Sequence, residues 1–212
     1  MLASTGQERV ELASQSEIEA TLLKFHAFLD DQQDGETSGV VYSITDDGNR
    51  TVKGKFRVAR AANQKVLFEY ENDFKIAVAG NGRTCDYKTF RGIVKRNQDL
   101  DATLSAVSGI TKGASLVVAS VFSAGPRHEE LKKSITSSTF REYKHFGNQL
   151  CAVFRVERSS YRLDYAVNPT TGSLVAIERK SKIFARRNRI LYEVHDFLPK
   201  VIADDEFRIT LE

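Results

Sequence analysis

The sequence predicts an α+β protein built on one antiparallel sheet, with helical segments before the strands and in the middle of them. From Gly39 to Arg96, and again from Phe140 onward, apolar residues recur at every second position between short turns. This pattern is typical of consecutive β-hairpins. Because no helical segment follows each strand, the sequence argues against a doubly wound parallel sheet.

Composition indicates a single compact domain. The 212 residues include 41% hydrophobic residues, 13 Phe and 7 Tyr, which supply enough apolar surface for a core and argue against a disordered chain. The longest uncharged stretch, Gly113–Pro126, is shorter than the roughly 20 residues of a spanning helix. The net charge of +3 gives no reason to expect a nucleic-acid partner.

The first structured segment is expected to be a helix over residues 16–31. Ser16 and the glutamates after it have the form of a capping box, and Ile18, Leu22, Phe25 and Leu29 share one stripe of the helix. Residues 1–15 are expected to be a flexible leader, and residues 16–212 a single domain.

The alternating segments predict about ten or eleven strands. Turn residues at 46–49, 61–64, 80–82 and 168–172 separate the earlier strands. Residues 183–185, 190–197 and 207–211 are expected to supply the last ones.

Residues 97–136 interrupt the strands. Asn97 or Asp99 can cap a helix in which Leu100, Leu104 and Val107 share a face. Residues 114–122 are apolar nearly all round; we favour a helix there, although their β-branched content leaves a strand open. Pro126 is expected to begin a short polar helix.

A curved sheet covered by this insertion would enclose an apolar pocket, and the alternative is that the same side chains fill one another's space as an ordinary core. The candidate ligand-binding residues, assigned on one choice of strand face, come from the sheet and from the insertion. They are Phe56, Val58, Phe68, Tyr70, Ile76, Leu104, Val107, Leu116 and Phe122.

One basic cluster near the end of the chain is a candidate contact for anionic lipid or an acidic partner, or else solvated strand edges. It consists of Lys180, Lys182, Arg186, Arg187 and Arg189. Glu193 and His195 share a strand face and are a weaker candidate for an acid/base pair. The motifs of hydrolases, NTPases and metal sites are absent from the sequence, so we expect no enzyme, no cofactor and no metal.

The order of elements resembles a family of predicted periplasmic proteins with a LolA/LolB-like fold, that of the lipoprotein localisation factors. The resemblance rests on residues 56–60 and 66–70, the Gly80–Gly82 turn, residues 147–154 and 161–165, and the turn that begins at Pro169. It implies an unclosed β-barrel with a helical lid, formed by residues 97–136, over a hydrophobic cavity.

The resemblance also implies a function and a location. We expect a monomeric, periplasmic or otherwise extracytoplasmic protein of the cell envelope that binds a lipid, an acyl chain or a lipoprotein. A membrane- or protein-interaction module without a ligand is the alternative. Outside the cytoplasm Cys85 and Cys151 can oxidise to a disulfide, with two buried thiols as the alternative.

Overall fold

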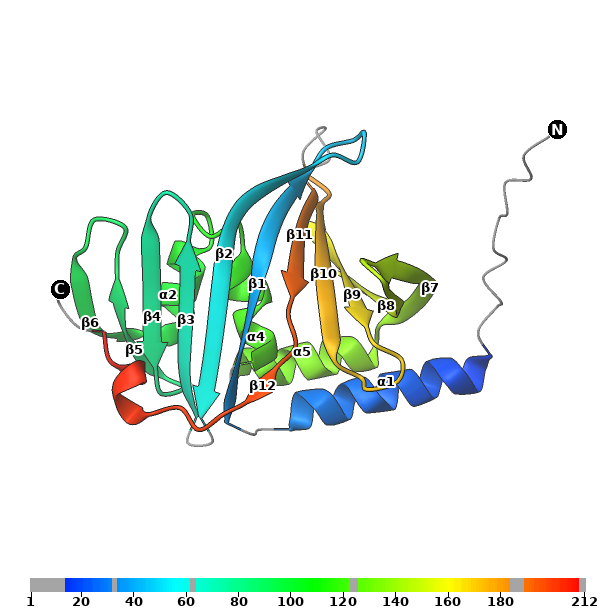
Figure 1. The fold of residues 1–212 in the computed structure, drawn as a ribbon, viewed down its shortest axis with the longest axis horizontal. Coiled ribbons are helices and arrows are strands. Elements are labelled where there is room, and N and C mark those ends of the chain that lie inside the picture. The colour runs from blue at the N-terminus through cyan, green and yellow to red at the C-terminus, as the bar shows by residue number, and fades with distance from the viewer. Residues whose placement is uncertain (1–13, 32–33, 62–63, 123–125, 184–188, 210–212) are drawn as a thin grey trace.

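One antiparallel sheet frames the molecule in the computed structural model, which describes residues 14–31, 34–61, 64–122, 126–183 and 189–209 (Figure 1). The strands pair in the spatial order β6-β5-β4-β3-β2-β1-β11-β10-β9-β8-β7, and β12 pairs with β1. They are β1 (Gly35–Ile44), β2 (Arg50–Ala61), β3 (Lys65–Glu71), β4 (Lys75–Gly80), β5 (Thr84–Lys88), β6 (Val94–Asp99), β7 (Thr139–Phe146), β8 (Gln149–Glu157), β9 (Tyr161–Val167), β10 (Leu174–Ser181), β11 (Arg189–Val194) and β12 (Leu198–Pro199).

The sheet is unclosed. Within the described residues β6 and β7 each pair on one side only. Two hairpin series, β1–β6 and β7–β11, meet where β1 pairs with β11, with Gly39 opposite Val194 and Ile44 opposite Arg189. The α+β class and the unclosed antiparallel sheet are therefore confirmed.

The chain between the two series forms helices that cover one face of the sheet. These are α2 (Leu100–Val107), α3 (Ala114–Val117), α4 (Ala119–Phe122) and α5 (Pro126–Thr136), called the lid below. Asp99 caps α2 by accepting a hydrogen bond from the Ala102 backbone, and residues 114–122 are helical, as expected. In Figure 1 the lid lies behind the strands, and we call the covered surface the lid face and its opposite the outer face.

The largest hydrophobic core lies between the lid and the sheet. Alternate residues of the strands face it, including Phe68 and Tyr70 of β3, and the lid adds Leu104, Val118 and Phe122. Period-two strands and an apolar insertion therefore bury their apolar sides against each other.

A smaller core lies on the outer face. Ile202, Phe207 and Ile209 of the C-terminal segment pack there with Ala59 and Leu67. Phe207 ends a 3₁₀ turn, η1 (Asp204–Phe207), and the described residues after it form no strand, so the strand expected at 207–211 is wrong as far as Ile209. The three acidic residues of η1 favour a turn held by ion pairs, such as that of Asp204 with Lys65 at 2.6 Å.

The two ends of the sheet differ. Because successive strands reverse direction, the turns at 45–49, 72–74, 89–93 and 158–160 share one end, called the open end below. Helix α1 (Gln15–Asp30) runs past the other end, where Lys24 Nζ donates to the Pro169 carbonyl at 3.0 Å (Figure 1).

The first helix begins earlier than expected. Ser14 is its N-cap and forms the capping box with Glu17, whereas Ser16 lies inside the helix. Of the expected leader, residues 1–13 lie outside the described residues. Phe25 and Leu29 are buried, and Ile18 and Leu22 pack against the same core, so the expected apolar stripe is correct.

Candidate functional site

The nine candidate ligand-binding residues all lie at the interface of lid and sheet. Eight are buried, each exposed by 6% or less, and Leu116 is partly buried beside them. The strand face chosen from the sequence is thus the lid face, and a slip of one residue would have moved the whole set to the outer face.

These nine side chains pack in one core together with other apolar residues. Phe122, for example, stacks on Phe197 with ring centroids 5.9 Å apart and meets the edge of Phe28 at 6.1 Å. Of the nine, Leu116 alone lines one of the three hollows described below. In this closed arrangement the predicted pocket is mainly a filled core, with one hollow at its border.

That hollow lies between the lid and strand β9 and has a volume of about 260 Å³. Its apolar lining comes from both layers: Leu116, Val117 and Leu131 from the lid, and Tyr161, Leu163 and Tyr165 from β9. These β9 residues were not among the candidates predicted from the sequence. Their alternation placed them on an apolar face, but which strand lies under the lid depends on how the lid docks.

Two arginines stand at the rim of this hollow. Arg127 donates from Nε to Asp101 at 2.5 Å and also to the Asp101 carbonyl and to Ser105, so Asp101 neutralises it. Arg158 lies 3.4 Å from the exposed carboxylate of Glu130 and donates to Ser134 at 2.7 Å. An exposed pair at that distance is weak, so Arg158 is the rim cation that an anionic group can recruit most readily.

Within the described residues the lid is tied to the sheet by few polar contacts. The buried Tyr192 hydroxyl on β11 donates to the Lys112 carbonyl in the loop before α3 at 2.6 Å. Gly113 allows this approach, because a Cβ at this position would lie 2.8 Å from the Tyr192 hydroxyl oxygen. The φ angle of Gly113 is +91°, a conformation that favours glycine. Burial raises the pKa of Tyr192, so the hydroxyl stays protonated and remains a donor.

Inside the lid the buried hydroxyls pair with one another. Thr111 Oγ donates to Ser115 Oγ at 3.1 Å, and Ser115 Oγ donates to the Leu104 carbonyl at 2.7 Å. His128 is 3% exposed, with Nδ1 placed 3.2 Å from the Ser120 carbonyl and Nε2 without a partner among the described residues. The lid is thus a self-contained unit that contacts the sheet mainly through apolar side chains.

Solved structures share this arrangement of sheet and helices. A crystal structure of MucB matches with a TM-score of 0.51 and 12% identity, over 93% of this chain and 64% of that one. The complex structure of Pseudomonas aeruginosa MucA/MucB matches with a TM-score of 0.48 and 13% identity, over 91% and 61%. LolA superfamily protein NE2245 from Nitrosomonas europaea matches with a TM-score of 0.40 and 11% identity, over 90% and 97%.

The fold is LolA-like. No protein-family model and no curated protein matches the sequence. At these identities the likeness concerns the fold, and function must be argued from this chain's own LolA-like sheet and lid.

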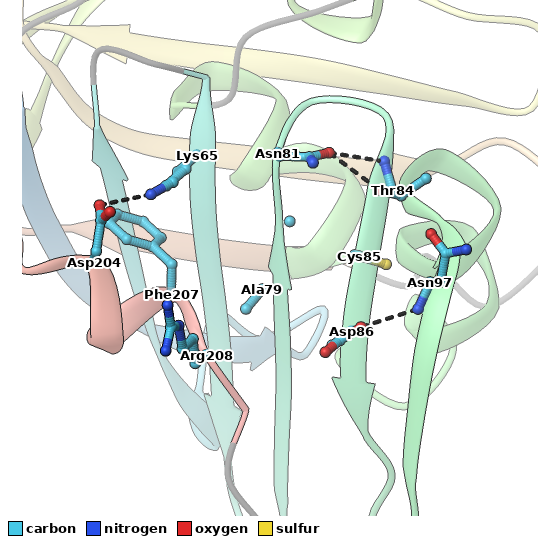
Figure 2. A pocket seen from close by; sticks show the side chains of 11 residues that line it. Lys65, Ala79, Asn81, Thr84, Cys85, Asp86, Asn97, Asp204, Phe207 and Arg208 are labelled. Carbon is cyan, nitrogen blue, oxygen red and sulfur yellow. Dashed lines mark hydrogen bonds and ion pairs between the residues drawn. The ribbon is translucent and has the colours of Figure 1, made fainter.

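A second hollow of the LolA-like sheet, about 270 Å³, lies on its outer face beside the C-terminal segment. Figure 2 shows that its polar side chains mostly satisfy one another: Lys65 pairs with Asp204, and Asn81 accepts from Thr84. Asp86 accepts from the Asn97 backbone at 2.9 Å. The Lys65–Asp204 pair holds the C-terminal segment on the sheet, and these contacts leave little free binding capacity.

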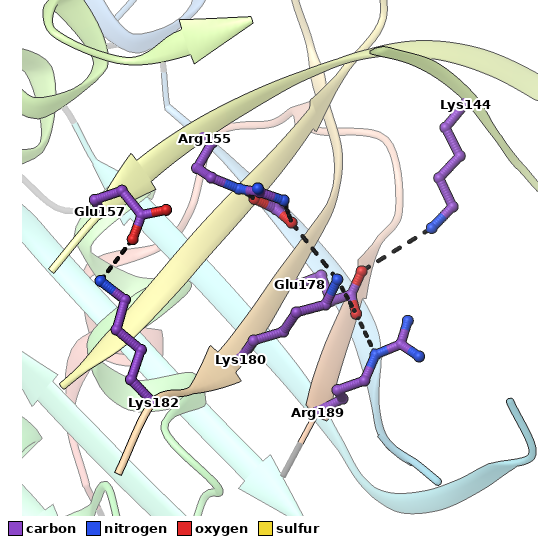
Figure 3. Close-up of polar contacts among 8 residues, drawn as sticks. Lys144, Arg155, Glu157, Glu178, Lys180, Lys182 and Arg189 are labelled. Atoms are coloured by element: carbon purple, nitrogen blue, oxygen red, sulfur yellow. Dashed lines mark hydrogen bonds and ion pairs between the residues drawn. The ribbon is translucent and has the colours of Figure 1, made fainter. Parts of the chain in front are cut away.

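The predicted basic cluster is largely neutralised where it is described. Lys180 lies 3.4 Å from Glu178, Arg189 donates to Glu178 at 2.7 Å, and Lys182 lies 2.6 Å from Glu157 (Figure 3). Arg186 and Arg187 lie outside the described residues. Glu157 of β8 meets Lys182, and Glu178 of β10 meets Arg189 of β11, through the pairing of distant segments that the sequence pattern did not show. Lys180 lies two residues after Glu178 on the same strand.

Buried carboxylates anchor this outer-face network. Asp164, 7% exposed, receives two hydrogen bonds from Arg155, at 2.6 and 2.8 Å, and Glu178 is 5% exposed. Burial lowers the pKa of Lys180, an effect that the neighbouring carboxylates oppose. The arrangement holds β8, β9 and β10 together rather than presenting a free basic patch.

Cys85 and Cys151 are both free and buried. They lie on β5 and β8, eight positions apart in the strand order, and belong to different cores. The structure therefore shows the two-thiol alternative and not the disulfide. Burial raises the pKa of both thiols, that of Cys151 to about 11, which makes them poor nucleophiles.

The weaker candidates gain no support from the LolA-like structure. Glu193 pairs with Arg50 at 2.6 Å, and His195 contacts Ser38 at 3.0 Å, both on the surface. No group of three or more metal-ligating side chains occurs among the described residues. Within the same residues no helix is long and apolar enough to cross a membrane.

A third hollow, about 550 Å³, lies at the open end. It is lined by Val52, Gly54 and three lysines, together with Glu71 and Asp73. One of the lysines, Lys112, belongs to the lid loop that Tyr192 holds. Both this hollow and the one beside β9 therefore border the lid.

Proposed function

We propose that this protein is a non-enzymatic, extracytoplasmic binding protein that holds the acyl chain of a lipid or acylated ligand between lid and sheet. The observation that carries the proposal is the hollow between the lid and β9, which is lined by apolar side chains from both layers and bounded by Arg158. An acyl chain would enter there and spread along the lid–sheet interface. The extracytoplasmic location rests on the resemblance to predicted periplasmic proteins.

The volume of the hollow limits how much of an acyl chain it can hold while the lid stays in place. At about 260 Å³ it is slightly smaller than the roughly 300–1,000 Å³ of ordinary ligand pockets. A long acyl chain therefore requires the lid to move, and the few polar ties between lid and sheet favour such movement. Each buried CH₂ group contributes about 0.8 kcal/mol, so chain length sets the affinity.

The rim supplies the second element of recognition. Arg158 can exchange its weak contact with Glu130 for the carboxylate or phosphate of a ligand. The apolar part of the ligand would then contact Leu163 and Tyr165, and its anionic group would remain at the surface. Fatty acids and phospholipids have this chemistry.

Titration with a fluorescent fatty acid tests the proposal. Ser120→Phe places a ring in the hollow, because Ser120 lines it. The Ser120 hydroxyl donates a hydrogen bond to the Val117 carbonyl of the lid. We expect this variant to fold and to lose fatty-acid binding. Ser137→Phe is the matched control, since the Ser137 hydroxyl also bonds the carbonyl three residues earlier but the residue is exposed outside the hollow.

Three outcomes decide the matter. Binding by the wild type and the control, with loss in Ser120→Phe, supports the proposal. No binding by the wild type, or equal binding by all three proteins, contradicts it. In either contradictory case, an interaction module without a small-molecule ligand would become the better description.

A further inference from the structure

We propose that the open end carries a docking surface for anionic phospholipid membranes, formed by the tips of the β3–β4 and β5–β6 hairpins and the segments that face them. This contact is separate from the proposed ligand site and does not depend on it. The surface is called the tip surface below.

The two hairpin tips form one unit. Phe74 in the β3–β4 turn and Phe90 in the β5–β6 turn contact each other, with ring centroids 5.7 Å apart. The register places the tips side by side, because Ala77 on β4 pairs with Lys88 on β5. Residues 52–55 of β2 and Lys112 of the lid border the same end, since they share a hollow with the β3–β4 turn.

Large apolar side chains are exposed at this end. Phe90 is 49% exposed, and Ile93 and Val52 are each 56% exposed. Phe90 and Ile93 lie on a projecting turn rather than in a groove. Apolar residues at projecting tips suit insertion between lipid headgroups better than docking against a rigid protein surface.

Unpaired cations surround these apolar residues. Within the described residues no ion pair is formed by the basic side chains Lys53, Lys55, Lys75, Arg91, Lys95 and Lys112. On the two tips and the facing segments the acidic groups are Glu71 and Asp73. The tip surface therefore has cations without ion pairs, whereas each cation drawn in Figure 3 lies within 4.0 Å of a carboxylate.

Two of these cations also contact aromatic rings. Arg91 lies 5.4 Å from the centre of the Phe90 ring, and Lys95 lies 5.8 Å from that of Tyr87. Alternating cationic and aromatic side chains match a phospholipid surface, whose headgroups attract cations and whose upper acyl layer accepts rings. Charge and apolar exposure together favour an anionic membrane over an acidic protein.

The experiment measures binding to vesicles of phosphatidylcholine and phosphatidylglycerol in equal amounts, and to vesicles of phosphatidylcholine alone. The wild type should bind the mixed vesicles and not the zwitterionic ones. The triple variant Lys55→Gln, Lys75→Gln, Arg91→Gln removes three exposed cations from the tip surface, and its affinity should fall about a hundredfold.

A charge-matched control separates the tip surface from net charge. The control variant Arg83→Gln, Lys133→Gln, Arg141→Gln also removes three exposed cations, but none of them lies on the tip surface. Arg83 lies in the β4–β5 turn at the other end of the sheet, Lys133 lies on α5, and Arg141 lies on β7. This control should keep most of the affinity. The proposal is overturned when the wild type binds neither vesicle or when the two triple variants lose affinity equally.

A second variant tests insertion. Phe90→Ser with Ile93→Ser changes two exposed side chains in a turn, so the fold should be retained, as a circular dichroism spectrum can show. Its affinity for mixed vesicles should fall roughly tenfold, and the loss should persist in high salt, where charge attraction is screened. Unchanged affinity would contradict insertion. Because these assays contain no fatty acid, their result is independent of the fatty-acid titration.

Discussion

The Tyr192 hydroxyl is the polar contact whose removal should loosen the lid most selectively. It donates to the Lys112 carbonyl at 2.6 Å from a fully buried ring. A neutral hydrogen bond of this kind contributes about 1 kcal/mol net, and the exposed Lys112 lets water reach the released carbonyl. Tyr192→Phe should therefore favour opening of the lid by about fivefold, the equilibrium factor for about 1 kcal/mol.

Hydrogen exchange of lid amides measures that opening. The amides of Val117, Val118 and Val121 are protected by backbone bonds within residues 113–121. In Tyr192→Phe they should exchange about fivefold faster when exchange is limited by lid opening. A labelled fatty acid should also enter and leave the variant faster.

Tyr70→Phe is the matched control. The Tyr70 hydroxyl is also buried and also donates at 2.6 Å to a backbone carbonyl, that of Lys53, but both residues belong to the sheet. This variant should lose a similar amount of global stability in urea without selective acceleration of the lid amides. The reasoning is refuted when Tyr192→Phe leaves lid exchange unchanged, or when both variants accelerate it equally.

Three further predictions concern the rim, the pH dependence and the thiols. Arg158→Gln should weaken binding of a fatty acid about fivefold and leave a fatty alcohol unaffected; equal loss for both ligands would contradict the role of the rim. The pKa of Glu36 is lowered chiefly by hydrogen bonds from Arg57, so its carboxylate stabilises the fold above the unfolded-state pKa, and this contribution is lost as the pH falls through the folded-state pKa. Glu36→Gln should therefore lower the urea midpoint in neutral buffer but not in strongly acidic buffer; an equal loss in both would show that the charge is not responsible. Cys85 and Cys151 should resist a thiol reagent in the native protein and both titrate in denaturant without reductant; fewer than two thiols would contradict the free state.

Local patterns in the sequence predicted the layers of the fold. Alternation around Phe56, Val58, Phe68 and Tyr70 predicts which side of each strand faces the lid, because a slip of one residue would move all four to the outer face. The spacing of Leu100, Leu104 and Val107 likewise predicted the buried face of α2, and all three are buried.

The remaining features depend on contacts between distant segments. Arg189 of β11 meets Glu178 of β10 only through the register of neighbouring strands, which composition and periodicity do not encode. The position of Tyr161 and Tyr165 under the lid depends on how the lid docks. The true cap, Ser14, was missed because Ser16 offers a competing serine two residues later.

The proposed function requires that this LolA-like protein holds an acyl chain between lid and sheet. Native mass spectrometry of the purified protein, followed by organic extraction and lipid analysis, tests it most directly. We expect a co-purifying acyl species that is released on denaturation, or a mass gain when fatty acid or phospholipid is added. A ligand-free mass that gains nothing from either lipid would contradict it.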